Sequence, residues 1–206
     1  MAPRTKDDDL IYFDEFSRLP RHLVMTALQV TSFAAHFLDL NEPKSFLWPE
    51  FLRGINEYRG GDLSLDKFQS NSIHQQEATV STMVDRIVDF LRVVLSVALR
   101  QEDIDALHKS IETTFTDLKT AKEKGWADFS GSSTSSNSSW QYRVQFAFPN
   151  PHLEDFFYSL VTTINLEANI REEHSWWGLT STTRRNFSAK IDAMQLIVIK
   201  GFRDPR

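Results

Sequence analysis

Three stretches in the second half of the chain alternate apolar and polar residues. They span residues 140–148, 156–170 and 187–201. Alternation with a period of two places successive side chains on opposite faces of a β-strand. Globular strands average about 5 or 6 residues, whereas a strand that crosses a bilayer needs about 9 to 11 residues with the same alternation. All three stretches reach the longer length, so they suit either a sheet in water or a sheet in a membrane.

The two faces of these stretches differ in polarity. One face is apolar, interrupted at Thr162 in the second stretch. In a membrane it would contact lipid through Val144, Phe146, Phe148, Tyr158, Leu160, Ile164, Leu166, Ile191 and Ile197. The opposite face carries polar residues that would line a water-filled lumen, namely Arg143, Gln145, Asn165, Glu167 and Asp192.

The first half of the chain has the apolar spacing of amphipathic helices. We expect helices over about 21–38, 49–58 and 76–100, and a further helix after a polar break at 101–103 that ends by Gly125. In the 76–100 helix, charged residues lie opposite the apolar stripe, which favours packing on a sheet over spanning lipid.

Helices followed by consecutive strands predict an α+β fold with a mainly antiparallel sheet. The 206 residues are 41% hydrophobic, enough for one well-buried core, so we expect a single domain over residues 1–206. Amphipathic helical hairpins within about 21–120 would flank long strands within about 140–201. The serine-rich residues between 129 and 140 are expected to form a loop.

No catalytic or metal-binding pattern is found. The chain has no cysteine, and its six histidines are scattered without metal-ligand spacing. There is no phosphate-binding glycine loop and no GxSxG motif. We therefore predict no cofactor and no enzymatic activity. The net charge of -5 argues against a nucleic-acid partner.

The sequence has no transmembrane helix and no visible secretory signal. No run of about 18 apolar residues is present. Met1–Asp9 is followed by no apolar signal-peptide core.

Two features near the C-terminus suggest contact with a surface. Trp176 and Trp177 suit a membrane interface, although at least one of them could instead pack in the core. Arg184, Arg185 and Lys190 form a basic cluster that could bind anionic lipid headgroups or sulfated glycans. The alternative is a solvated rim of cations.

Three segments carry a resemblance to a known family. Residues 93–99, residues 114–118 leading to Trp126, and the strand 142–148 ending at Pro149-Asn150 resemble the central region of the Cyt-type δ-endotoxins in sequence, order and spacing. The resemblance covers about residues 70–200 and is strongest to a fungal cardiotoxin of that family. It implies a single domain with helical hairpin layers around a sheet, which binds membranes, oligomerises and permeabilises cells. It also implies a secreted protein that acts at the target-cell membrane.

These observations lead to a hypothesis about mechanism. The helices at 21–38 and 76–120 would act as removable covers, and their displacement would let the strands insert into a bilayer. Three strands cannot close a barrel, so neighbouring copies must contribute strands. The alternatives are detergent-like disruption without a defined pore, and a non-lytic module that binds glycans.

Overall fold

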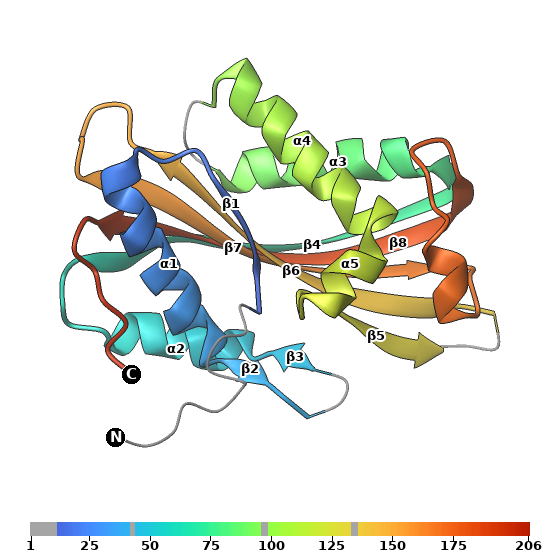
Figure 1. Ribbon diagram of the computed structural model, residues 1–206, viewed down its shortest axis with the longest axis horizontal. Coiled ribbons are helices and arrows are strands. Elements are labelled where there is room, and N and C mark those ends of the chain that lie inside the picture. The colour runs from blue at the N-terminus through green and yellow to red at the C-terminus, as the bar shows by residue number, and fades with distance from the viewer. Residues whose placement is uncertain (1–11, 42–43, 96–98, 133–135) are drawn as a thin grey trace.

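A single mixed sheet forms the centre of the molecule (Figure 1). The computed structural model describes residues 12–41, 44–95, 99–132 and 136–206. The strand order is β1 (Asp14–Ser17), β6 (Ser138–Pro149), β7 (Phe156–Ala168), β8 (Arg184–Ile199) and β4 (Leu63–Thr79), and β5 (Ala127–Ser132) also pairs with β6. Only β1 pairs in parallel. A separate ribbon joins β2 (Leu38–Asp39) to β3 (Ser45–Phe46).

Helices cover both faces of this sheet. One face lies under α1 (Arg21–Ala35) and α2 (Trp48–Glu57), and we name it the α1 face. The other face lies under α3 (Val80–Val94), α4 (Gln101–Thr116) and α5 (Leu118–Glu123), and we name it the α3 face. Each layer encloses its own hydrophobic core, and the sheet separates the two cores.

The predicted strands and helices are largely confirmed. The alternating stretches are β6, β7 and β8, and the predicted helices correspond to α1, α2, α3 and α4. The expected α+β fold is therefore correct. The supposed polar break at residues 101–103 is instead the first turn of α4.

β4, the longest strand of the sheet, was not predicted from the sequence. A helix was predicted from Gln76, whereas α3 begins at Val80. Thr79 is the N-cap of α3 and accepts a hydrogen bond from the Thr82 amide at 3.1 Å. The strand was not predicted because β4 is an edge strand with polar residues on both faces, so it lacks the alternation that marks its neighbours. The short strands β1 and β5 were also not predicted. β5 occupies part of the expected serine-rich loop, whose residues 133–135 lie outside the described residues.

Among the described residues, none of the helices has both the length and the apolar composition needed to cross a membrane.

Candidate functional site

The α3 face carries a mainly apolar surface across β6, β7 and β8, interrupted by buried Thr162 on β7 and buried Gln195 on β8. Strand pairing aligns Tyr142, Ile164 and Ile191 in one row across the three strands. The structure brings all nine predicted lipid-facing residues to this face. Tyr158 and Ile197, in the last row, are half-buried, and the other seven are buried: Val144, Phe146, Phe148, Leu160, Ile164, Leu166 and Ile191.

The helices on this face form one continuous excursion of the chain, residues 80–123, between β4 and β5. We call it the α3–α5 cover. Its contact with the sheet is mainly apolar, and the ring of Phe115 on α4 meets that of Phe187 on β8 edge-on at 5.7 Å. Its polar links include Lys67 of β4, which donates to the Val93 carbonyl at 2.7 Å, and an ion pair between Lys122 and Glu173. Arg18, which follows β1, pairs with Glu102 at 2.7 Å and with Asp103 at 3.1 Å at the start of α4.

Within the cover, α3 and α4 are linked to each other. His108 lies 2.8 Å from Asp85, across the two helices. After α5 the chain turns at Gly125, whose φ of +80° is accessible to glycine at low cost. The cover is therefore attached to the rest of the molecule by its apolar side, by its two chain ends and by the side-chain links of Lys67, Lys122 and Arg18.

The predicted lumen-facing residues do lie together on the α1 face, but the most central of them are buried. Arg143 is fully buried and bonds the Asp128 carboxylate and the Gly125 carbonyl, each at 2.6 Å. Gln145 donates to Ser159 at 2.8 Å and also contacts Thr31 of α1. In the folded monomer Arg143 and Gln145 are therefore not solvated, and the lumen-facing role predicted for them concerns the membrane-inserted state.

The rest of the α1 face changes from polar to apolar along the strands. Asn165 and Glu167 are half-buried, while Asp192 is buried and bonded to Ser70. Toward the other end of β7 and β8, five apolar residues pack under α1 and α2: Phe157, Val161, Met194, Leu196 and Val198. Only half of this face is polar, because the other half carries a second core under the α1–α2 layer.

β1 occupies part of the outer edge of β6. It pairs in parallel with residues 144–147. Burial raises the pKa of both Asp14 and Glu15, although hydrogen bonds from Tyr142 and Thr31 respectively oppose the rise. This strand therefore holds two carboxyl groups in a partly desolvated environment.

The paired tryptophans separate into two environments. Trp176 is fully buried, and its indole N–H donates to the Ser138 hydroxyl at 2.8 Å. It cannot contact a membrane surface in this conformation, so its assignment as a contact residue is wrong for the folded monomer, and the core alternative holds for it. Trp177 is 41% exposed, and the Lys119 ammonium lies 5.6 Å from its ring centroid.

The predicted basic cluster is also divided. Arg184 and Arg185 line a cavity of about 570 Å³ together with Glu77, Asn169 and Asn186. Their guanidinium groups donate to the carbonyls of Glu77 and Arg184, at 3.1 and 2.8 Å respectively. Among the described residues, neither forms an ion pair with a carboxylate. Lys190 is exposed farther along β8.

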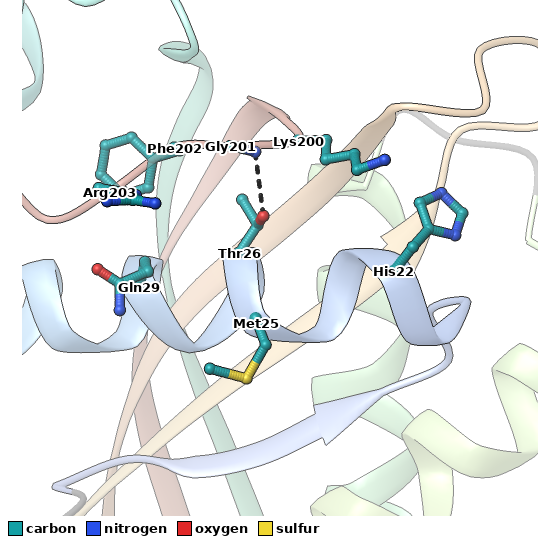
Figure 2. Close-up of a pocket in the computed structure, with 8 residues that line it drawn as sticks. All are labelled: His22, Met25, Thr26, Gln29, Lys200, Gly201, Phe202 and Arg203. Atoms are coloured by element: carbon teal, nitrogen blue, oxygen red, sulfur yellow. Dashed lines mark hydrogen bonds between the residues drawn. The ribbon is translucent and has the colours of Figure 1, made fainter.

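A second cavity, of about 560 Å³, was not predicted from the sequence. It lies where the segment after β8 crosses α1, between His22, Met25, Thr26 and Gln29 on the helix and residues 200–203 (Figure 2). The Gly201 amide donates to the Thr26 hydroxyl at 3.2 Å. The lining of this cavity contains no nucleophile–base pair. Within the described parts of the chain, no group of three or more potential ligands could hold a metal ion.

Two curated relatives match parts of the chain. One is a type-1Ba cytolytic delta-endotoxin of Bacillus thuringiensis subsp. neoleoensis, 36% identical over 40% of this chain and 31% of the relative. The other is a type-1Aa cytolytic delta-endotoxin of Bacillus thuringiensis subsp. morrisoni, 28% identical over 52% of this chain and 42% of the relative. The matches thus span less than half the length of these relatives.

Two solved structures share the fold. A delta-endotoxin aligns with a TM-score of 0.84 and 16% identity, over 100% of this chain and 94% of the other. The activated Cyt2Ba monomer from Bacillus thuringiensis subsp. israelensis aligns with a TM-score of 0.80 and 17% identity, over 91% and 98%. The expected Cyt-type fold is therefore confirmed.

The family model described as Bacillus thuringiensis toxin matches residues 23–200. The two curated relatives are named as cytolytic delta-endotoxins. Since the match covers most of the 206 residues, the chain belongs to the Bacillus thuringiensis toxin family, that of the cytolytic δ-endotoxins.

Proposed function

We propose that this protein is a cytolytic, pore-forming toxin that binds lipid membranes, oligomerises on them and inserts β-strands after its covering helices have been displaced. The observation that carries the proposal is the α3 face. Three adjacent long strands present a mainly apolar surface, and most of that surface lies under one excursion of the chain. A covered surface of this kind can exchange helix contacts for lipid contacts without breaking the strand pairing.

The dimensions of this surface suit a bilayer. Its rows run from Ser138, Ala168 and Phe187 to Phe148, Tyr158 and Ile197. Ten residue steps along β6 correspond to about 34 Å at the usual rise per residue. A tilt of about 45° reduces this height to about 24 Å, close to the apolar band of about 25 Å in strand-built membrane proteins.

The asymmetry between the two helical layers favours displacement of the α3–α5 cover alone. Exposing most of the α3 face requires residues 80–123 to move, and these leave the sheet at Thr79 and return at residues 124–126. The segment between β7 and β8 covers the Ser138 end of the face through Trp176 and Leu179. The α1–α2 layer covers the opposite face, where Gln145 and Thr31 form a buried polar contact. This revises the initial hypothesis, in which both layers were removable.

The polar half of the α1 face would then line the lumen. Arg143, Gln145, Asn165, Glu167 and Asp192 keep this role in the proposal, although Arg143 must first lose its contact with Asp128. The apolar half of that face would remain beneath α1 and α2, on the lumen side of the sheet.

Trp177, Arg184, Arg185 and Lys190 are the proposed first contacts with the membrane. All four are exposed, and the two arginines border a cavity without a partner carboxylate among the described residues. Anionic lipid headgroups or sulfated glycans match this charge. As part of the same proposal, the protein is secreted, acts at the outside of a target cell and is closely related to a fungal cardiotoxin.

Crosslinking tests the displacement step. In K122C/E173C, a short thiol-reactive linker would join α5 to the segment between β7 and β8, at the place of the native ion pair. We expect the linked protein to bind vesicles and to release little trapped dye. The matched control, D85C/H108C, links α3 to α4 inside the cover and should leave leakage unchanged.

Leakage by linked K122C/E173C at the rate of its unlinked form would refute displacement of the cover. Detergent-like disruption would then be favoured, provided that release showed no size limit for osmolytes. Glycan binding without any leakage would instead support the non-lytic module.

A further inference from the structure

The two edges of the long-stranded sheet differ in whether another strand pairs with them. β4 pairs with β8 alone, and among the described residues no backbone group of residues 67–78 bonds to backbone outside the sheet. An unpaired edge is a template for another strand. The opposite edge, on β6, is occupied by β1 at residues 144–147 and by β5 at residues 138–142.

The open edge of β4 has little protection along its centre. Irregularities lie between Leu65 and Lys67 and between Gln75 and Ala78, and such bulges discourage pairing. Between them, residues 68–73 (Phe-Gln-Ser-Asn-Ser-Ile) carry no charge. Uncharged polar side chains of this kind allow close approach of another strand.

Strand direction determines what this edge can join. β6, β7, β8 and β4 alternate in direction, because each neighbouring pair is antiparallel. When copies stand side by side in one orientation, β4 of one copy is therefore antiparallel to β6 of the next. With only β6, β7 and β8, the joining strands β8 and β6 would be parallel. Closed membrane-spanning sheets are built from antiparallel strands.

We infer that β4 is the docking strand for a second copy of this chain, pairing antiparallel with β6 of the next copy after β1 has left that edge. Each copy thus contributes four strands. The inference rests on the proposed function, because a closed sheet is needed only in the membrane. Such a contact joins two different surfaces, so repeating it gives a ring when the rotation closes.

β1 is suited to be the strand that leaves. It has four residues, too few to span a bilayer, and it is parallel to β6. Asp14 and Glu15 are partly desolvated there, a condition that weakens its attachment. While β1 stays, it prevents addition of a second copy at residues 144–147. Pairing would begin there and extend along β6 as β5 is displaced.

The first experiment locks β1 in place. Ser17 and Ala147 are direct neighbours in the β1–β6 pairing, so a disulfide in S17C/A147C would hold β1 on the edge. We expect the oxidised protein to bind vesicles as a monomer and to release dye at least tenfold more slowly, with recovery on reduction. The control, D39C/S45C, places the same bond in the β2–β3 ribbon and should oligomerise normally. Normal oligomers from oxidised S17C/A147C would overturn the inference.

The second experiment identifies the partner strand. Q141C on β6 is mixed with S70C, S72C or H74C on β4, all on the α1 face, and oxidised on leaking vesicles. The three β4 positions allow for a stagger between copies. We expect mixed β4–β6 dimers from at least one pair. Leakage with only β4–β4 dimers, or with no crosslink at all, overturns the docking inference but leaves the pore intact. Parent protein that neither leaks dye nor oligomerises overturns both.

Discussion

Truncating one aromatic residue in each helical layer tests which layer must move. Phe115 on α4 is fully buried against the α3 face and contacts Phe187 of β8. Phe33 on α1 is 1% exposed in the opposite core and contacts Phe37, Phe51 and Phe202. Replacing a buried phenylalanine by alanine costs about 3–5 kcal/mol, so F115A and F33A should lose similar free energies of unfolding.

The two variants should nevertheless differ in activity. If only about 1.4 kcal/mol of the loss in F115A falls on the cover–sheet contact, the opening equilibrium shifts about tenfold, and leakage limited by opening accelerates equally. F33A loosens a layer that need not move, so its leakage rate should stay near that of the parent.

The assay combines urea unfolding with dye release from vesicles, at a temperature where both variants remain folded. Equal acceleration by F33A and F115A would mean that general instability, not displacement of the α3–α5 cover, controls activity. No acceleration by F115A, despite a measured loss of stability, would show that cover displacement is not the limiting step.

Three further predictions concern charged groups. R143M removes the buried partner of Asp128 and leaves it only the Lys44 ammonium at 3.6 Å, so urea unfolding should show a loss of about 3–5 kcal/mol. Adding D128N should restore part of that loss, and no loss would contradict the buried pairing. Because burial raises the pKa of Asp14 and Glu15 above their ordinary values of 3.8 and 4.5, the parent gains stability as pH falls through the raised values. D14N/E15Q should therefore be more stable than the parent at pH 7, with the advantage shrinking toward pH 4, and a pH-independent difference in urea midpoint would refute this. R184Q/R185Q should bind anionic vesicles about 25-fold more weakly in a cosedimentation assay at low salt, because each lost cation costs about 1 kcal/mol of binding free energy. The control R53Q/R59Q removes two arginines on and after α2 and should bind like the parent. Equal losses in the two variants would indicate that net charge alone controls binding.

The sequence predicted the α3 face well because local alternation encodes it. Along β6, apolar residues from Trp140 to Phe148 occupy every second position, and the structure buries all of them under the α3–α5 cover. The helices α1 and α3 were predictable for the same reason, since their apolar spacing has a helical period.

The remaining features depend on contacts between distant parts of the chain. Arg143 looked solvated, but its partners are Asp128 and the carbonyls of Tyr12 and Gly125, which only the fold brings near. Trp176 looked like a surface residue, but Ser138 provides a buried acceptor for its N–H. β4 gave no alternating signal because an edge strand is not forced to have one buried face.

Lipid-quenching spectroscopy tests the central claim, that the α3 face exchanges its helical cover for acyl chains, most directly. Fluorophores at Leu160→Cys, Ile164→Cys and Ile191→Cys report on that face, and Asn165→Cys reports on the opposite face of β7. With vesicles containing acyl-chain quenchers, we predict strong quenching at the first three positions and little at the fourth. Unchanged fluorescence at all three positions, on vesicles that the labelled proteins demonstrably rupture, would contradict the account.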